Sequence, residues 1–165
     1  MNYATIKHFD IANGKGVRTS LFVSGCQFYC RNCFNLEAQD YNYGRLYTKE
    51  TEKHILDSLK PNYIKGLSIL GGDPLWQNKE DIEQLISLVS KTKFMGKDIW
   101  IWSGFIWEKL SPTQHKLVDL CDVFIDGKYV DELRDLTLKW RGSLNQRVID
   151  VQKTIKEGKL HEICN

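Results

Sequence analysis

TSLFVSGCQFYCRNC, residues 19–33, is the stretch that decides the fold. Its first part contains the apolar run Leu21-Phe22-Val23, which predicts a strand from about Thr19 to Ser24 that ends at Gly25. Its second part places Cys26, Cys30 and Cys33 in one short loop with the spacing C-x3-C-x2-C. The stretch therefore predicts a strand that leads directly into a loop of metal-binding side chains.

The three cysteines of this loop predict an iron–sulfur centre. Three thiolates are able to hold three corners of a cubic [4Fe-4S] cluster, and the four-cysteine spacing of ferredoxins is absent. No fourth cysteine lies nearby, so one iron is left open to a substrate. A zinc site closed by His54, Cys121 or Cys164 is the alternative, because structural zinc takes four protein ligands. Five cysteines, an odd number, make a disulfide framework the weaker alternative.

Length and composition indicate one globular domain, residues 1–165, with a core at about 16–151 and a polar tail at about 152–165. The chain is 42% hydrophobic and 27% charged, and its net charge of +2 is too small to indicate nucleic-acid binding. No apolar run approaches the length of a membrane span, and the first residues lack a secretory signal. We expect a cytoplasmic protein without a membrane or nucleic-acid partner.

A repeated pattern of strand, glycine-bearing loop and helix follows the cysteine loop. Further strands are expected at Leu67 to Leu70, Asp98 to Trp102 and Val123 to Ile125, with a final one at Arg147 to Val151. The helices are expected at Thr48 to Lys60 with Thr48 as N-cap, at Asn78 to Lys93, and from Ser111-Pro112 onward.

Strands that alternate with helices predict a parallel sheet with right-handed crossovers. The loops that follow the strands then meet at its carboxyl edge, where α/β folds place their active sites. These loops are the cysteine loop, GGDP (71–74), WSG (102–104) and IDG (125–127). A closed eight-stranded barrel takes about 250 residues. The expected fold is therefore α/β, an incomplete, open βα barrel.

Seven motifs in consistent order cover nearly the whole chain. They are GVRTSLFVSGC (16–26), CRNCFN (30–35), GGDPL (71–75), DIW (98–100), WSG (102–104), IDG (125–127) and WRGSLNQR (140–147). The chain resembles the radical S-adenosylmethionine (SAM) enzymes, and among them the small activating proteins of anaerobic ribonucleotide reductases. Phe34, Leu70 and Ser103 depart from the residues common in that family, and none of them is a cluster ligand.

The resemblance implies a radical SAM fold and a glycyl-radical activase. In such enzymes the open iron binds the amino and carboxylate groups of SAM. An electron then breaks the sulfur–C5′ bond to give methionine and a 5′-deoxyadenosyl radical. That radical takes a hydrogen from a glycine of the partner, the large subunit of anaerobic ribonucleotide reductase. An electron donor such as flavodoxin is implied as a second partner.

The resemblance also implies which residues hold SAM. Gly71 and Gly72 allow close approach to its methionine portion, and Asp73 orients that loop or accepts from the ammonium group. Gly72→Val is therefore expected to weaken SAM binding and to spare the cluster. Ser103 is expected near the ribose or the adenine, and Asp126, on the next loop, is a further candidate SAM contact. Asn32, Cys33 and Phe34 are expected beside the adenine.

Each of these loops has a simpler interpretation as well. GGDP, Ser-Gly and Asp-Gly are ordinary turn sequences. Period-two aromatic residues from Trp100 to Trp107 indicate core packing on one sheet face. The four histidines are expected on the surface, Cys121 as a buried small hydrophobe, and Cys164 as an exposed residue. The stretch Trp140 to Arg147 either borders a partner opening or is a structural loop with solvent-exposed arginines.

Three functions fit the sequence. Activation of the reductase is preferred, since the chain lacks an added ferredoxin-like cysteine region and is short enough to leave its site open to a large protein. A small radical SAM enzyme acting on a small molecule is the first alternative. A non-catalytic, metal-stabilised binding module is the second.

Overall fold

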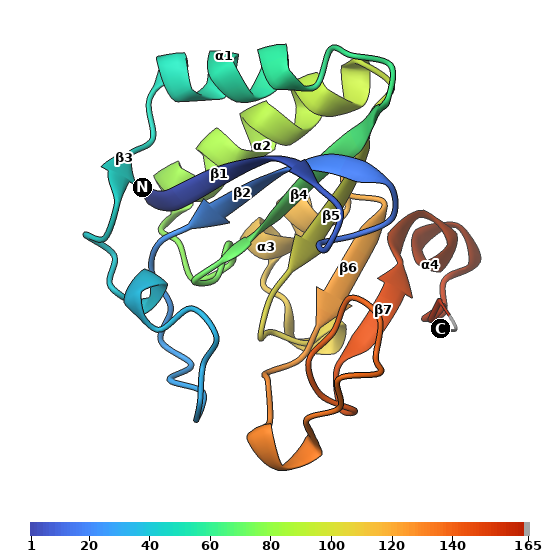
Figure 1. Ribbon diagram of the computed structural model, residues 1–165. Helices are drawn as coiled ribbons and strands as arrows, with labels where there is room; N and C mark the ends of the chain where they lie inside the picture. The colour runs from blue at the N-terminus through green and yellow to red at the C-terminus, as the bar shows by residue number, and fades with distance from the viewer. Residues whose placement is uncertain (164–165) are drawn as a thin grey trace.

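Four parallel strands form the centre of the sheet in a computed structural model of the protein, which describes residues 1–163 (Figure 1). They are β2 (Val17–Val23), β4 (Ile64–Gly71), β5 (Asp98–Trp102) and β6 (Val123–Asp126). The helices α1 (Lys49–Ser58), α2 (Lys79–Phe94) and α3 (Pro112–Val118) connect them. The predicted strands and helices are confirmed within about three residues at each end.

The sheet is mixed rather than wholly parallel. Its order is β3-β1-β2-β4-β5-β6-β7, and β1 (Asn2–Asp10), β3 (Arg45–Leu46) and β7 (Arg147–Asp150) pair with their neighbours in antiparallel fashion. Within residues 1–163, β3 and β7 are the two edges, so the sheet does not close on itself. Barrel-like curvature of this open sheet stays a prediction.

The ends of the chain contain structure that the sequence did not predict. β1 precedes the core expected from about residue 16, and α4 (Val151–Glu157) occupies the start of the expected polar tail. Ile149 and Glu162 form a further antiparallel bridge. Short 3-10 turns lie at Glu37–Gln39, Trp107–Lys109 and Asp131–Leu133. Cys164, expected on the surface, lies outside the described residues.

The helices begin where their capping residues predict. The side chains of Thr48, Asn78 and Ser111 each accept a hydrogen bond from the backbone N–H three residues later. Such a bond satisfies one of the N–H groups that a helix leaves unpaired at its start. Pro112 follows Ser111 at the first helical position, where its missing N–H costs nothing.

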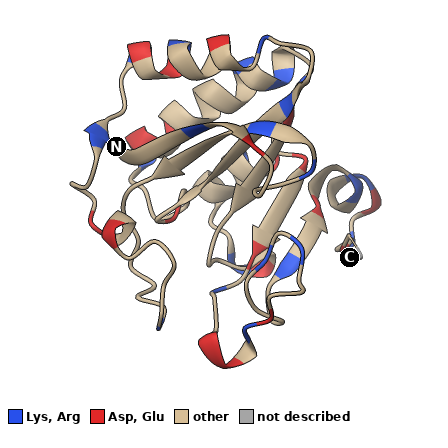
Figure 2. Cartoon of the chain, viewed as in Figure 1, with Lys and Arg blue, Asp and Glu red and all other residues tan. Residues whose placement is uncertain are grey.

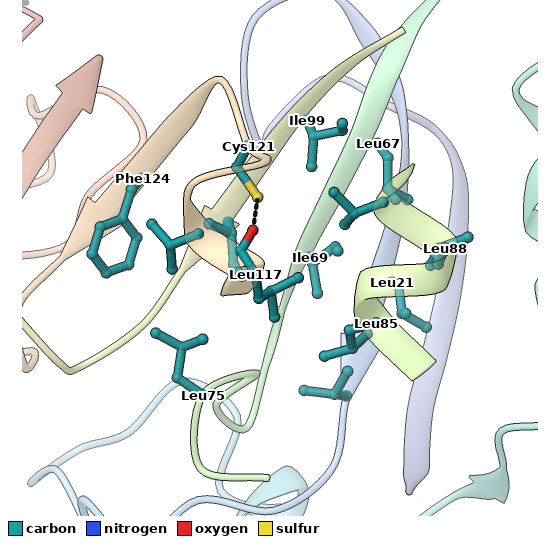
Figure 3. Packing of buried hydrophobic residues seen from close by; sticks show 14 of the residues in the cluster. Leu21, Leu67, Ile69, Leu75, Leu85, Leu88, Ile99, Leu117, Cys121 and Phe124 are labelled. Carbon is teal, nitrogen blue, oxygen red and sulfur yellow. Dashed lines mark hydrogen bonds between the residues drawn. The ribbon is translucent and has the colours of Figure 1, made fainter. Parts of the chain in front are cut away.

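One face of the sheet is covered by α1, α2 and α3 and holds the main hydrophobic core. Figure 3 shows Leu21, Ile69 and Ile99 of the strands packed against Leu85 and Leu88 of α2, with Leu117 and Cys121 beside them. Cys121 is fully buried, and its thiol donates to the Leu117 carbonyl at 3.5 Å. Burial raises the pKa of this thiol, so Cys121 is the expected small hydrophobe.

The opposite face carries a second cluster, which contains Trp100 and Trp102. Phe105 and Trp107 pack instead against the main core on the helix-covered side. The interpretation of one aromatic face was therefore wrong, since the strand and its period of two end at Trp102. Charged residues of both signs are interspersed over the elements (Figure 2). No helix among residues 1–163 has the length and apolar character that crossing a membrane requires.

Candidate functional site

The cysteine loop leaves β2 at Val23 and is anchored at its base. Gly25 takes φ +104°, and a Cβ there would strike the Tyr41 ring. The Gly25 N–H donates to the Ala38 carbonyl at 2.8 Å, and the Cys26 N–H donates to the Gln39 carbonyl at 3.1 Å. The start of the cysteine loop is therefore held against the returning segment at Ala38 and Gln39, beside the end of the sheet.

The three cysteines of the loop are free thiols. Cys26 is buried, Cys30 and Cys33 are half-buried, and the Cys33 N–H donates to the Cys30 carbonyl at 3.1 Å. Residues 1–163 contain no ready-made group of three or more His, Cys, Asp or Glu side chains that could hold a metal ion. Neither His54, paired with His8, nor Cys121, buried in the core, completes a zinc site with this loop.

Two thiols of this loop, those of Cys26 and Cys30, ionise less readily than a free cysteine. Burial raises the pKa of Cys26 to about 12, and the charges of Asp73, Cys30 and Cys33 act in the same direction. Burial also raises the pKa of Cys30. Thiolates are the ligating form, so metal binding must offset these costs and release protons. An all-thiol donor set on a half-buried loop fits a soft, iron–sulfur type of centre.

Asp73 fastens the GGDP loop to the WSG loop. It is fully buried, and its carboxylate oxygens accept from the Ser103 hydroxyl at 2.9 Å each, from the Gly104 N–H at 2.7 Å and from the Leu75 N–H at 2.8 Å. Burial raises the pKa of Asp73 to about 6, against the lowering effect of these hydrogen bonds. The geometry supports the orienting role of Asp73, because protein donors already occupy both oxygens.

The two glycines of GGDP lie against the base of the cysteine loop. Gly71 takes φ +120°, and a Cβ there would strike the backbone of Val23. A Cβ on Gly72 would lie 2.6 Å from the Gly25 carbonyl oxygen and would also strike the Ala38 carbonyl. The Gly72 N–H donates to the Val23 carbonyl at 2.7 Å. Close contact within the protein therefore requires glycine at both positions.

An aromatic cluster that the sequence did not predict joins three of the loops. Phe28, between Cys26 and Cys30, has its ring centroid 5.6 Å from that of Trp76 and 5.0 Å from that of Phe105. The Trp76 and Phe105 centroids are 5.0 Å apart. The available signal was an aromatic residue inside the cysteine loop and another just after each of GGDPL and WSG. This packing orients the cysteine loop over the sheet edge.

Asp126 belongs to a different network. It is fully buried and pairs with Arg147 at 2.5 and 2.9 Å, and it accepts from the Trp107 N–H at 2.9 Å. Arg147 also pairs with Glu108 at 2.8 Å. The IDG loop still meets the WSG side, since the Gly127 N–H donates to the Phe105 carbonyl at 3.1 Å. The expected meeting of four loops at one edge is therefore confirmed.

Asn32 and Phe34 lie on the outer part of the cysteine loop. Asn32 takes φ +53°, and its side-chain amide donates to Asp131 at 2.8 Å. Phe34 is 96% exposed, so its ring has almost no protein contact. The structure therefore ties Asn32 to the segment after β6 and leaves Phe34 open to solvent.

The stretch 140–147 makes contacts within the fold and its arginines are not simply solvated, while a role toward a partner stays a prediction. Its carbonyls and amides hold the IDG segment: Gln146 donates to the Gly127 carbonyl at 2.9 Å and Asn145 to the Lys128 carbonyl at 2.8 Å. The Trp102 indole donates to the Trp140 carbonyl at 2.7 Å. Because Arg147 neutralises a buried carboxylate, it is a poor probe of a partner surface.

Comparison with known proteins identifies the family. Residues 12–149 match the model of the 4Fe-4S single cluster domain. The anaerobic ribonucleoside-triphosphate reductase-activating protein of Escherichia coli K12 is 44% identical over 151 residues, which cover 90% of this chain and 97% of that protein. The chain belongs to this family of activating proteins. Relatives with the same name occur in phage T4, at 44% over 90% of this chain and 93% of that protein, and in Vibrio cholerae, at 42% over 88% and 96%.

Proposed function

We propose that the protein is a radical SAM activating enzyme that generates the glycyl radical of an anaerobic ribonucleotide reductase. The observation that carries the proposal is the C-x3-C-x2-C loop fastened to the GGDP loop at the carboxyl edge of the sheet, in a member of the activating-protein family. Cys26, Cys30 and Cys33 are the proposed ligands of a [4Fe-4S] cluster. This cluster, when bound, supplies the open iron and the electron for SAM cleavage.

The protein's own part is to hold the reactants at one edge. Backbone bonds from Gly72 and Asp73 to Val23 and Gly25 fix the GGDP loop beside the cysteines. We assign the methionine portion of SAM to Gly71, Gly72 and Asp73, whose buried carboxylate has only neutral donors as hydrogen-bond partners. An ammonium or sulfonium near this edge would therefore be attracted to an unneutralised negative charge.

The adenosyl portion is assigned to the neighbouring segments. Asn32, Cys33 and Phe34 are the proposed adenine contacts, with the exposed Phe34 ring free to stack on a base. Ser103 and Asp126 are proposed to position the loops that contact SAM and not to contact SAM themselves. The Ser103 side chain already hydrogen-bonds to Asp73, and the Asp126 side chain to Arg147. Bound SAM would supply the 5′-deoxyadenosyl group that accepts the hydrogen from the glycine α-carbon of the reductase.

The proposed setting is the cytoplasm, with the reductase large subunit as substrate and a reduced donor such as flavodoxin as electron source. The open sheet, with β3 and β7 unjoined, suits a site that a loop of a large protein enters. An open barrel of the radical SAM type is the fold that we propose for this arrangement.

Anaerobic reconstitution followed by electron paramagnetic resonance tests the proposal. Reduced protein with SAM should release methionine and 5′-deoxyadenosine and should produce a glycine-centred signal in the reductase. SAM cleavage without that signal would favour a small-molecule substrate. Stoichiometric zinc with no iron uptake and no SAM cleavage would favour a metal-stabilised binding module.

A further inference from the structure

Two histidines from separate elements meet outside the site described above. His8 lies on β1 and His54 on α1, and their Nε2 atoms are 3.1 Å apart. The two rings are nearly perpendicular, at 87°, with centroids 5.0 Å apart. Both side chains line a groove of about 530 Å³ that Tyr3 and Glu50 also line.

This groove is separate from the cysteine loop. β1 runs antiparallel to β2, with Lys7 opposite Ser20 and Asp10 opposite Arg18. His8 therefore lies beside the first half of β2, whereas the cysteines follow its last residue. His54 is in the sixth position of α1, whose buried Ile55 packs on the helix-covered face of the sheet.

The two imidazoles are available as ligands. Within residues 1–163, the only hydrogen bond recorded for either ring is the one to the other ring. Burial and the neighbouring His54 lower the pKa of His8, which favours the neutral form that binds metals. The backbone of each residue is held independently, by pairing of β1 with β2 and by the Thr48 cap of α1.

The separation of the nitrogens suits a shared metal ion. Two nitrogens on one tetrahedral zinc, with bonds of 2.0–2.1 Å, are about 3.3 Å apart. The observed 3.1 Å between the two Nε2 atoms lies close to that separation, and both rings are exposed. Imidazole suits zinc, copper and nickel and not magnesium or calcium, which prefer oxygen ligands.

We propose that His8 and His54 form a two-histidine site for one Zn²⁺ or Ni²⁺ ion, with water completing the coordination. The ion joins β1 to α1 across the groove. Glu50, one turn before His54, lines the same groove and supplies the carboxylate that we assign to accept from a metal-bound water. Arg45 also lines the groove, and its positive charge disfavours a metal cation there. Metal binding therefore depends on the two histidine ligands.

Calorimetric titration of Ni²⁺ into cluster-loaded protein tests the site, with the cluster absorbance followed in parallel. One Ni²⁺ should bind at this site, and His8→Gln or His54→Gln should each weaken its binding at least tenfold. Loss of a residue that only hydrogen-bonds to a metal ligand already lowers metal affinity about 10–100-fold, and loss of the ligand itself should cost no less. His115→Gln is the matched control, because His115 is paired with Asp119 on α3 and away from the groove. It should leave the titration unchanged.

Two results would overturn the proposal. Unchanged binding in both His8→Gln and His54→Gln would assign the Ni²⁺ to other groups. The parent protein could instead show two equal, independent weak sites, of which each variant loses one. That result would show adventitious Ni²⁺ binding to single histidines. Nitrogen-15 spectra of the imidazoles with Zn²⁺ give an independent check. Both Nε2 signals should move together in the parent protein, and the remaining one should stay in place in each variant.

Discussion

The two ends of the parallel strands both bury a charge, but in opposite ways. At the amino end, Arg18 is fully buried and pairs with Asp98 at 2.6 Å, while Ser68 and the Leu67 carbonyl accept from it at 2.7 and 2.8 Å. At the carboxyl end, Asp73 is buried as well, and all of its hydrogen-bond donors are neutral. The amino end neutralises its charge within the fold, as the Asp126–Arg147 pair does at the carboxyl end. The Asp73 carboxylate has no cationic partner among residues 1–163 and belongs to the loop proposed to bind a cationic ligand.

This difference separates stability from function. The pair at the amino end ties β2 to β5 across β4 and contacts no proposed cofactor residue. The carboxyl end holds the proposed cluster ligands, and burial raises the pKa of two of them, Cys26 and Cys30. Substitutions at the amino end should therefore change the unfolding free energy, and substitutions at the carboxyl end should change the binding of iron and SAM.

The largest expected effect is on the cluster. Cys30→Ala removes one of three proposed ligands, so reconstituted iron should fall from about four per chain to near none. Because Cys30 is only half-buried, the unfolding free energy of the iron-free protein should change by less than about 0.5 kcal/mol. Iron analysis and urea unfolding measure the two quantities. Full iron retention would remove Cys30 from the ligand set.

Arg18→Met should give the opposite result. Loss of one partner of a fully buried ion pair destabilises a protein by roughly 3–5 kcal/mol, because the remaining charge is left without compensation. The Asp98 side chain is 27% exposed, so water solvates its charge in part and the expected loss is smaller than that figure. Urea unfolding should show this loss, while the folded fraction still takes up iron. The double change Arg18→Met with Asp98→Asn should recover part of the loss. An unfolding free energy equal to that of the parent protein would contradict this account of the amino end.

Asp73→Asn tests the uncompensated charge through its pH dependence. The pKa of Asp73 is raised from 3.8 to about 6 on folding, so between these values the folded state keeps a proton that the unfolded state has lost. Its contribution to stability is therefore present below pH 4 and falls by about 3 kcal/mol as the pH rises to about 7. The amide side chain of the variant cannot ionise, so the variant should lack this fall. If the unfolding free energies of the two proteins changed by the same amount between pH 4 and pH 7, the Asp73 charge would be compensated within the fold.

The smallest expected effect concerns the start of α2, just after the GGDP loop. The Asn78 side chain accepts from the Asp81 N–H at 2.8 Å, and Asn78→Ala should cost about 1 kcal/mol. Because the cap lies outside the loops that meet the cysteines, iron content should not change. A fall in iron with this variant would mean that the carboxyl edge depends on the position of α2.

The sequence predicted the central strands and helices because their signals are local. Apolar runs and capping side chains act within a few residues, so β5 and the start of α3 were located to the residue. β1 was missed because it has mostly exposed and half-buried side chains and no continuous apolar run. α4 was missed since only Val151 and Thr154 of its residues are buried.

The site was predictable in its topology but not in its contacts. Parallel strands bring their following loops to one edge, which is why the meeting of GGDP with the cysteine loop could be expected. That Gly72 packs on Gly25 and Ala38 depends on the path of the returning segment, which no local pattern encodes. Gly72→Val should therefore disturb the cysteine loop as well as SAM binding, so it cannot separate the two as the sequence suggested. The roles of individual residues toward SAM stay predictions.

The order β3-β1-β2-β4-β5-β6-β7 also bears on how the molecule is built during synthesis. Each strand, as it follows in the chain, adds to a free edge of the strands already made, and none has to insert between two earlier ones. The strand order therefore requires no earlier strand to move aside for a later one. The cysteine loop lies between the second and third strands made. Its base therefore has its supporting strands early, while the loops that pack on it arrive one at a time.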